Sequence, residues 1–280
     1  MNLDKRNVED ILPATPLQQG MIYHALAADD AAMYLEQYGF SVYGDLEPDR
    51  YRMAWQQTLD QQPMLRTTFL WEGLSKAYQV VHKQLTMAFE HVHLGNLEDE
   101  RQAEALDQLR QRHRTRGFDL NRGPLFSVSV VSLAAGHHKV WLTLHHLLAD
   151  GWSLALLLSE VNRRYQSPAL PIEAPIPFRR YCEWLETQDQ QLARQWWEDR
   201  FSRGSFAGSA PLAVRHHSGT SQAFDLALNS EDSARWRQGC TKQGLTESTV
   251  FSAAWAMLLS RYLHQDRVVF GYTVSTRPPD

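Results

Sequence analysis

The stretch that decides the fold is residues 140–153, VWLTLHHLLADGWS. An apolar run with β-strand character ends in two adjacent histidines, and an Asp-Gly pair follows three residues later. The run predicts a buried strand, and aspartate before glycine is typical of a turn. The stretch therefore predicts a strand, a turn and a helix. It also places a titratable imidazole, a carboxylate and a glycine close together at the end of the strand.

The two histidines are predicted to point to opposite faces, because side chains alternate along a strand. His146 shares a face with Leu144, and His145 shares the other face with Thr143. Only one of the two imidazoles can therefore face a given cavity, and the other is expected to be packed and hydrogen-bonded. Strand parity does not decide which face meets a substrate.

Asp150 has two interpretations. It can cap the turn before the next helix, as aspartate commonly does. It can also form an ion pair that fixes the loop, with Arg66 as the expected partner. Arg66 lies in the extended run 65–71, whose neighbours are apolar or β-branched, and burying an unpaired arginine there would be costly.

Other chemistries are disfavoured by spacing. No further histidine stands at a metal-ligand spacing from the pair, so no metal site is predicted. Ser153 is near in sequence, but the chain has no Gly-x-Ser-x-Gly elbow, phosphate loop or dinucleotide fingerprint. What remains is proton transfer or positioning by one histidine while a bound amine or hydroxyl attacks an activated acyl group.

Composition excludes several classes of protein. The chain has 280 residues and a net charge of −4, with no basic face, so nucleic acid is not an expected partner. No run approaches the roughly 20 apolar residues of a membrane span, and the charged N-terminus is unlike a signal peptide. The two cysteines, Cys182 and Cys240, form no disulfide framework, which favours a reducing cytoplasm.

The hydrophobic pattern predicts a mixed α/β (α+β) protein with two lobes. We expect one lobe in residues 1–172 and the start of a second, incomplete lobe in residues 173–280, with the proline-rich segment 167–177 as the boundary. Strands are expected at 38–43, 65–71, 78–82, from 126, at 137–146, 224–228 and 268–274. Helices are expected from 15, at 51–62 and 98–116, from 153, around Trp184 to Trp197, and at 231–243 and 249–263.

The motif stretch also carries a family resemblance. Residues 144–153 resemble the core His-His-x-x-x-Asp-Gly motif of nonribosomal peptide synthetase condensation domains. Four further segments agree with that family in order. They are TPLQQGM (15–21), QPMLRTTF (62–69), FRRYCEW (178–184) and FGYTVSTRP (270–278).

The resemblance implies two chloramphenicol-acetyltransferase-like lobes around a tunnel. It implies amide formation between a donor acyl thioester and the amine of an acceptor aminoacyl thioester. Both would be held on phosphopantetheine of peptidyl carrier proteins, beside an adenylation domain of the same synthetase, with no cofactor bound by the domain itself. Carried over by motif, His146 is the catalytic residue, Asp150 and Arg66 form a structural ion pair, and His145, Gly151, Trp152 and Ser153 support the site.

Several questions stay open at this level. His146 can act as a base or by positioning the amine. The segment TPLQQGM is closer to condensation domains that accept a D-configured donor than to the plain L-to-L class. The resemblance also implies that much of the second lobe is missing, so a non-catalytic carrier-binding fragment is a rival interpretation. An epimerisation domain and an acyltransferase that uses coenzyme A also remain open.

Overall fold

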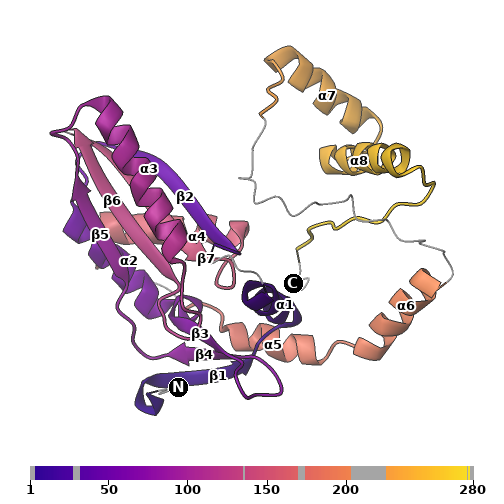
Figure 1. Cartoon of the computed structure of the whole chain (residues 1–280), viewed down its shortest axis with the longest axis horizontal. Helices are drawn as coiled ribbons and strands as arrows, with labels where there is room; N and C mark the ends of the chain where they lie inside the picture. The colour runs from indigo at the N-terminus through magenta and orange to yellow at the C-terminus, as the bar shows by residue number, and fades with distance from the viewer. Residues whose placement is uncertain are drawn as a thin grey trace. The chain divides into compact units, whose positions relative to one another are not determined.

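The computed structural model describes residues 4–27, 32–134, 136–169, 174–202, 225–275 and 277. These residues belong to two compact units, residues 1–187 and residues 188–280 (Figure 1). The secondary-structure elements of the first unit are η1 Lys5–Asn7, β1 Val8–Pro13, α1 Pro16–Ala27, β2 Leu35–Tyr43, α2 Pro48–Gln61, η2 Pro63–Arg66, β3 Thr67–Leu70, β4 Tyr78–His82, β5 Ala88–His93, α3 Asp99–Arg116, β6 Phe126–Ala134, β7 His137–His145, α4 Gly151–Gln166 and α5 Phe178–Glu186. Those of the second unit are α6 Gln190–Ser202, α7 Ser230–Lys242 and α8 Glu247–Leu263.

A four-stranded sheet with the order β2-β7-β6-β5 forms the centre of the first unit. Strands β2 and β6 both pair antiparallel with β7, whereas β5 and β6 run parallel. The strand β7 that carries the histidine motif is therefore flanked on both sides. This double pairing fixes the position of the strand end at His145.

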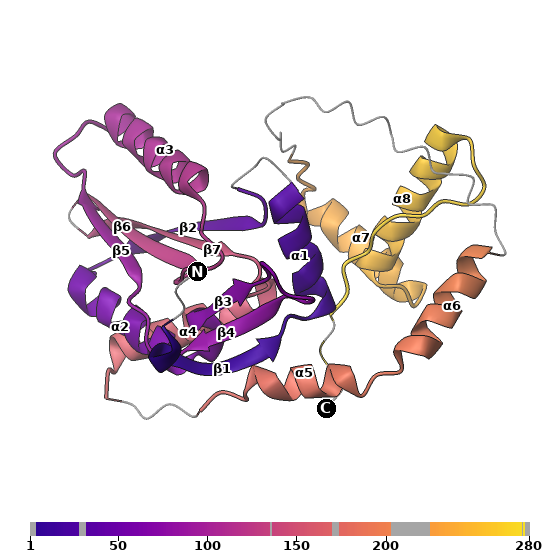
Figure 2. The ribbon, with the colours of Figure 1, turned by 60° about the horizontal axis from the view of Figure 1, so that its bottom comes forward.

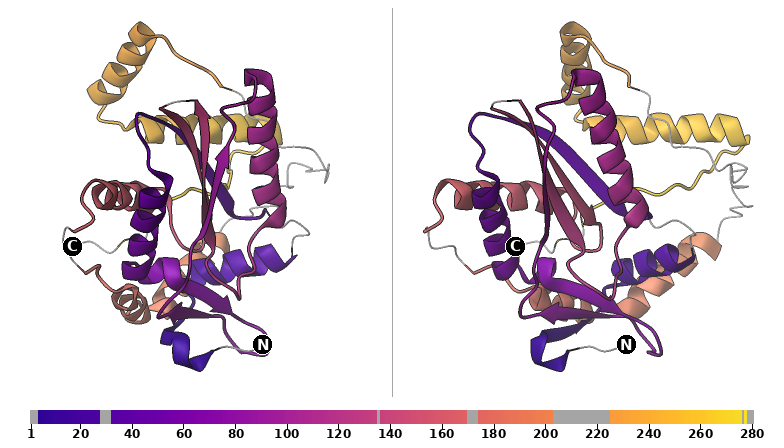
Figure 3. Two further views of the ribbon diagram at one scale, coloured as in Figure 1. Left: turned by 90° about the vertical axis from the view of Figure 1, so that its left-hand side faces the viewer. Right: turned by 60° about the vertical axis from the view of Figure 1, so that its left-hand side comes forward.

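The side chains of β6 alternate between the two faces of this sheet, and helices cover both faces. Phe126, Val128 and Val130 point into a core that also holds residues of α2 and α4, such as Trp55, which is fully buried. The intervening residues pack with α3 on the opposite face, where Leu109 of the helix meets Val131 and Leu133 of the strand. Figure 3 shows α2 and α4 on one side of the sheet and α3 on the other.

A smaller sheet lies beside the large one, with the order β1-β4-β3 and antiparallel pairing throughout (Figure 2). The sequence predicts an extended run over 65–71, but Pro63 begins the short helix η2, and the strand β3 begins only at Thr67. Arg66 therefore lies in a helical turn, where its side chain is directed inward. Strand β1 was not predicted, because its sequence VEDILP contains two acidic residues in the first half.

The helix expected from residue 15 is confirmed as α1, and it begins with a capping box. The Thr15 hydroxyl accepts from the Gln18 amide at 3.3 Å, and the Gln18 side-chain oxygen accepts from the Thr15 amide at 2.9 Å. Leu17 of this helix is exposed, its buried residues are Gln18 and Ile22, and Met21 and Ala25 pack against the core. The capping box directs the side chain of Gln18 inward. Ile22 lies one turn later on the same face of the helix and is buried with it.

Helix α5 belongs to the first unit. The sequence places the boundary at 172/173, and the compact units divide at 187/188. The helix packs against β1, where Arg179 pairs with Asp10 and Cys182 is buried against the side chain of Gln79. These contacts hold the segment after the proline-rich stretch on the small sheet (Figure 2).

The second unit is helical in its described residues. The predicted helices 231–243 and 249–263 are confirmed as α7 and α8, capped by the side chains of Asn229 and Thr246. The predicted strand 268–274 forms no ladder, because no described residue of this unit offers it a strand to pair with. Of the predicted strand 224–228, Phe224 lies outside the described residues, and the rest forms no strand.

Candidate functional site

The histidine motif forms a closed turn between β7 and α4. The amide of Leu148 donates to the carbonyl of His145 at 3.0 Å, which makes residues 145–148 a four-residue turn with His146 in its second position. The amide of His146 donates to the carbonyl of Tyr34, the residue before β2, at 2.8 Å. The side chains of Leu147 and Leu148 are buried in the main core. The backbone around His146 is therefore tied to the sheet and to the core.

His145 is the packed and hydrogen-bonded member of the pair. It is 3% exposed, and its Nδ1 accepts from the amide of Leu147 at 3.2 Å. Burial, followed by the neighbouring positive charge of His146, lowers the pKa of His145 to about 4. Nδ1 must be unprotonated to accept this hydrogen bond. The imidazole of His145 is therefore uncharged, and it stabilises the turn by bonding the amide of Leu147.

His146 is the partly exposed member of the pair. Its Nδ1 is buried and has no hydrogen-bond partner among the described residues. A buried polar atom without a partner is uncommon in proteins and often marks a functional group. Since Nδ1 is shielded, Nε2 is the nitrogen through which this ring can exchange a proton.

The residues after the turn begin α4. Asp150 is its N-cap, and its Oδ1 accepts from the amide of Ser153 at 2.7 Å and from the Ser153 hydroxyl at 2.5 Å. The Ser153 hydroxyl thus donates within the cap. A Cβ placed on Gly151 would have no heavy atom within 4 Å, and the side chain of Trp152 is exposed. The start of this helix is therefore open at these two residues.

The predicted ion pair between Asp150 and Arg66 is not formed, and this prediction is corrected by the structure. Arg66 is 5% exposed and pairs with Glu9 of β1. Its guanidinium also donates to three backbone carbonyls, those of Leu59, His82 and Lys83. The helical turn η2 directs the arginine toward the small sheet, where these acceptors lie. Glu9 was missed by the sequence analysis because strand β1 was not predicted.

Six of the seven predicted site residues therefore lie together on the turn and the first turn of α4, and Arg66 does not join them. Two buried amides, Gln18 and Gln79, were missed by the sequence analysis. Gln18 bonds the carbonyl of Leu147 in the histidine turn at 3.3 Å. The signal available for Gln79 is its position as a polar residue inside the largely apolar strand YQVVH.

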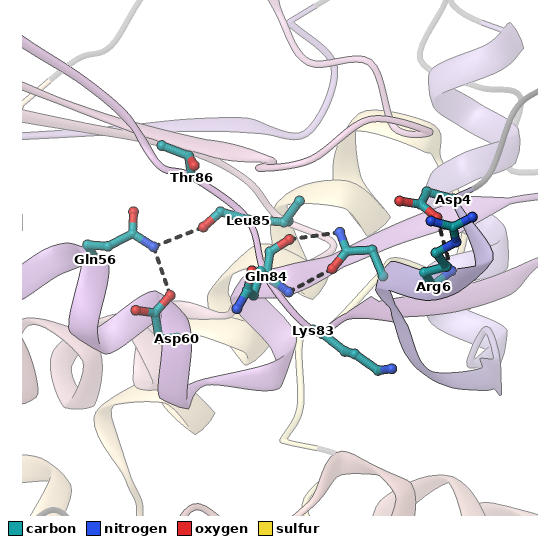
Figure 4. A pocket seen from close by; sticks show the side chains of 9 residues that line it. Asp4, Arg6, Gln56, Asp60, Lys83, Gln84, Leu85 and Thr86 are labelled. Carbon is teal, nitrogen blue, oxygen red and sulfur yellow. Dashed lines mark hydrogen bonds between the residues drawn. The ribbon is translucent and has the colours of Figure 1, made fainter.

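Two cavities lie elsewhere in the first unit. An open groove of about 1010 Å³ is bordered by η1, α2 and the loop after β4 (Figure 4). Two of its amide side chains bond locally, since Gln56 donates to Asp60 and to the carbonyl of Leu85, and Asn7 exchanges two hydrogen bonds with the backbone of Gln84. No predicted site residue lines this groove, and its polar groups hold the loop in place.

The second cavity, of about 690 Å³, lies where the C-terminal end of α3 meets β5 and β6. Its Glu90 pairs with Arg112 at 2.6 Å and with His113 at 3.3 Å. Within the described residues, no group of histidine, cysteine and carboxylate side chains could hold a metal ion. Within the same residues, no helix has the length and apolar character needed to span a bilayer.

Comparisons with known proteins agree with this geometry. A family model described as "Condensation domain" matches residues 8–280. Two linear gramicidin synthase proteins of Brevibacillus parabrevis align with 98% of the chain and are 32% and 34% identical to it. The chain covers only 4% and 6% of these two proteins.

Solved structures share the fold. The cyclization-docking bidomain of the EpoB synthetase from Sorangium cellulosum superposes with a TM-score of 0.71 at 20% identity, over 93% of this chain and 54% of that one. The first condensation domain of the calcium-dependent antibiotic synthetase, solved with a substrate analogue, gives a TM-score of 0.71 at 20% identity, over 94% and 63%. The expected resemblance is confirmed, and the chain belongs to the condensation-domain family.

Proposed function

We propose that this chain contributes the catalytic histidine to the condensation domain of a nonribosomal peptide synthetase. The reaction joins a donor acyl or peptidyl thioester to the amine of an acceptor aminoacyl thioester, with both substrates on phosphopantetheinyl carrier proteins. One observation carries the proposal. His146 is fixed in a hydrogen-bonded turn with Nδ1 shielded, and Gly151, at the start of the helix that follows, has open space where a side chain would lie.

The proposed role of His146 is to remove the proton that amide formation must release from the acceptor nitrogen. The acceptor nitrogen attacks the donor carbonyl carbon, the C–N bond forms, and the nitrogen of the tetrahedral adduct becomes positively charged. Nε2 of His146 takes one proton from that nitrogen. The adduct then collapses, the C–S bond breaks, and the proton passes to the departing sulfur. Such acid–base help is typically worth about 10²- to 10⁴-fold in rate.

The free amine does not itself require a base, because the ordinary pKa of an α-amino group is about 7.7–8.0. The proton that must move is the one on the adduct. His145 supports this step, since it is buried and neutral at physiological pH and adds no second positive charge beside His146. Asp150 and Ser153 fix the start of α4.

The partners follow from the same proposal. Carrier proteins present the two thioesters, and an adenylation domain of the same synthetase supplies the acceptor residue. The synthetase would work in the cytoplasm, which fits the two buried free cysteines, Cys182 and Cys240. The domain binds no cofactor of its own in this scheme, since the phosphopantetheine belongs to the carriers.

The test is a single-turnover assay of the full-length parent synthetase with loaded donor and acceptor carriers. His146→Ala should lower amide formation by about 10²- to 10⁴-fold. His137→Gln is the matched control, because His137 lies at the opposite end of β7 and stacks on Tyr43. Wild-type peptide formation by His146→Ala would reject the proposal.

Assays with the same loaded carriers distinguish the condensation reaction from the two rival functions. If the chain binds loaded carrier without any product, and the parent is also inactive, the domain is a carrier-binding module. If acyl-coenzyme A is turned over without carrier, the domain is an acyltransferase of another kind.

A further inference from the structure

A pair of buried glutamine side chains lies beneath the histidine turn. Gln79 of β4 is fully buried, and Gln18 of α1 is 6% exposed. A buried amide is costly unless its donors and its acceptor are all satisfied. Here they are. Gln18 Nε2 donates to Gln79 Oε1 at 3.1 Å and to the carbonyl of Leu147 at 3.3 Å, while its Oε1 accepts from the amide of Thr15.

Gln79 continues the chain of hydrogen bonds. Its Nε2 donates to the carbonyl of Pro13 at 3.0 Å and contacts Sγ of Cys182, in α5, at 3.9 Å. The carbonyls of Leu147 and Pro13 can only accept, so they determine which way both amides are oriented. Four elements are thus connected through two side chains: α1, the end of β1, β4 and α5.

The contact with Leu147 completes the anchoring of the turn. The amides of His146, Leu147 and Leu148 are bonded to the carbonyl of Tyr34, to Nδ1 of His145 and to the carbonyl of His145. The carbonyl of Leu147 is the next polar backbone group, and among the described residues it is the side chain of Gln18 that reaches it. Without this bond, the Leu147–Leu148 peptide is held through its amide alone, by the bond to the carbonyl of His145.

We propose that Gln18 and Gln79 are positioning residues for His146. Gln79 holds the amide of Gln18 in the orientation that bonds the carbonyl of Leu147, and this bond fixes the Leu147–Leu148 peptide, the second peptide after the residue that carries the catalytic imidazole. Neither glutamine touches the reacting atoms. The proposal rests on the proposed function, because it assigns these residues an effect on the reaction of His146.

A purely structural pair would stabilise the fold without favouring any one orientation of His146. Gln79→Met separates the two roles, because it keeps the length of the side chain and removes its hydrogen bonds. Thr58→Val is the matched control. Thr58 is also fully buried and donates to the carbonyl of Ala54 at 2.8 Å, and this bond lies inside α2.

The first measurement uses the full-length parent synthetase with loaded carriers. We expect Gln79→Met to lower kcat by about 10- to 100-fold, the size of loss that small misplacements of a catalytic group produce, and to leave KM for the acceptor carrier almost unchanged. Thr58→Val should leave both constants near the wild-type values. If both variants lower kcat equally, or if Gln79→Met leaves kcat unchanged, the proposal is wrong.

A second variant tests the bond to Leu147 while it keeps the capping box of α1. Gln18→Glu keeps the acceptor for the amide of Thr15, so the capping box survives, but it replaces the donor to Leu147 by a carboxylate oxygen. It should lower kcat at least as much as Gln79→Met. A Gln18→Glu protein that is folded and fully active would overturn the proposal.

The second measurement uses this chain alone and needs no activity. In histidine-¹³C-labelled protein, Gln79→Met should shift or broaden the imidazole resonance of His146 and leave that of His137 in place. An unmoved His146 resonance contradicts the positioning role. Failure of the proposed function looks different, since His146→Ala would then retain the wild-type rate whatever the glutamine variants do.

Discussion

Acidification from pH 6.5 to pH 4 will weaken the first unit through His145. In the native protein the pKa of this buried imidazole is about 4, because burial and then the charge of His146 disfavour its protonated form. In the unfolded chain the pKa returns to about 6.5. Between these two values the unfolded state binds a proton that the native state does not bind. The contribution of His145 to stability is therefore complete above pH 6.5 and is lost as the pH falls toward 4.

The magnitude follows from the difference between the two pKa values. One pKa unit corresponds to about 1.36 kcal/mol, and integration from pH 6.5 down to pH 4 gives a loss of about 3 kcal/mol in the free energy of unfolding. The structural counterpart is the bond from the Leu147 amide to Nδ1, which a proton on that nitrogen would abolish.

His145→Asn provides the comparison. The side-chain oxygen of asparagine lies where Nδ1 of histidine lies, so it can accept from the amide of Leu147, and it does not titrate. Urea denaturation followed by circular dichroism, at intervals from pH 7.5 to pH 4, measures the free energy of unfolding for both proteins. The remaining titrating groups are common to both, so the wild type should lose about 3 kcal/mol more than the variant. Parallel curves for the two proteins would refute the assignment of a lowered pKa to His145.

Three further substitutions test the packing around the site by urea denaturation. Arg66→Met should cost about 3–5 kcal/mol, because Glu9 and three carbonyls lose a buried donor, and Glu9→Gln should cost less; equal stability of Arg66→Met and wild type would contradict the buried network. Gly39→Ala should cost about 1–3 kcal/mol, because its Cβ would overlap the indole of Trp141 on the paired strand, and a neutral effect would show that the indole moves aside. Asp150→Ala should cost about 1 kcal/mol through the lost N-cap, and Asp150→Ser should restore most of it; no recovery in the serine variant would show that the cap is not the main contribution of this side chain.

The local elements were largely predictable because their signals are local. The capping box of α1, the end of α2 before Pro63, and the helix α3 follow from residues that neighbour one another in sequence. The predicted strand 137–146 ends one residue early, so strand alternation applies to His145 but does not place His146. His145 lies on the face of Thr143, where it is buried, and β7 ends before His146.

The ion pair of Arg66 was not predictable for a different reason. The need for a partner was visible, since arginine in an apolar run must be paired, but the identity of the partner depends on which strand lies opposite. Pairing of β1 with β4 brings Glu9 beside the carbonyls of His82 and Lys83, and nothing in the local pattern specifies that register. The glutamine pair was missed for the same reason, because Gln18 and Gln79 are 61 residues apart.

The two adjacent histidines lie in different environments because the strand ends between them. His145 is the last residue of β7, and the sheet buries it and keeps it uncharged. His146 is the first residue beyond the strand, and the turn exposes part of its ring while hydrogen bonds fix its backbone. When His146 gains a proton during the proposed reaction, the adjacent His145 is neutral, so the new charge meets no repulsion from that residue. A second protonated imidazole at position 145 would both oppose that charge and break the bond that supports the turn, and the burial of His145 prevents both effects at once.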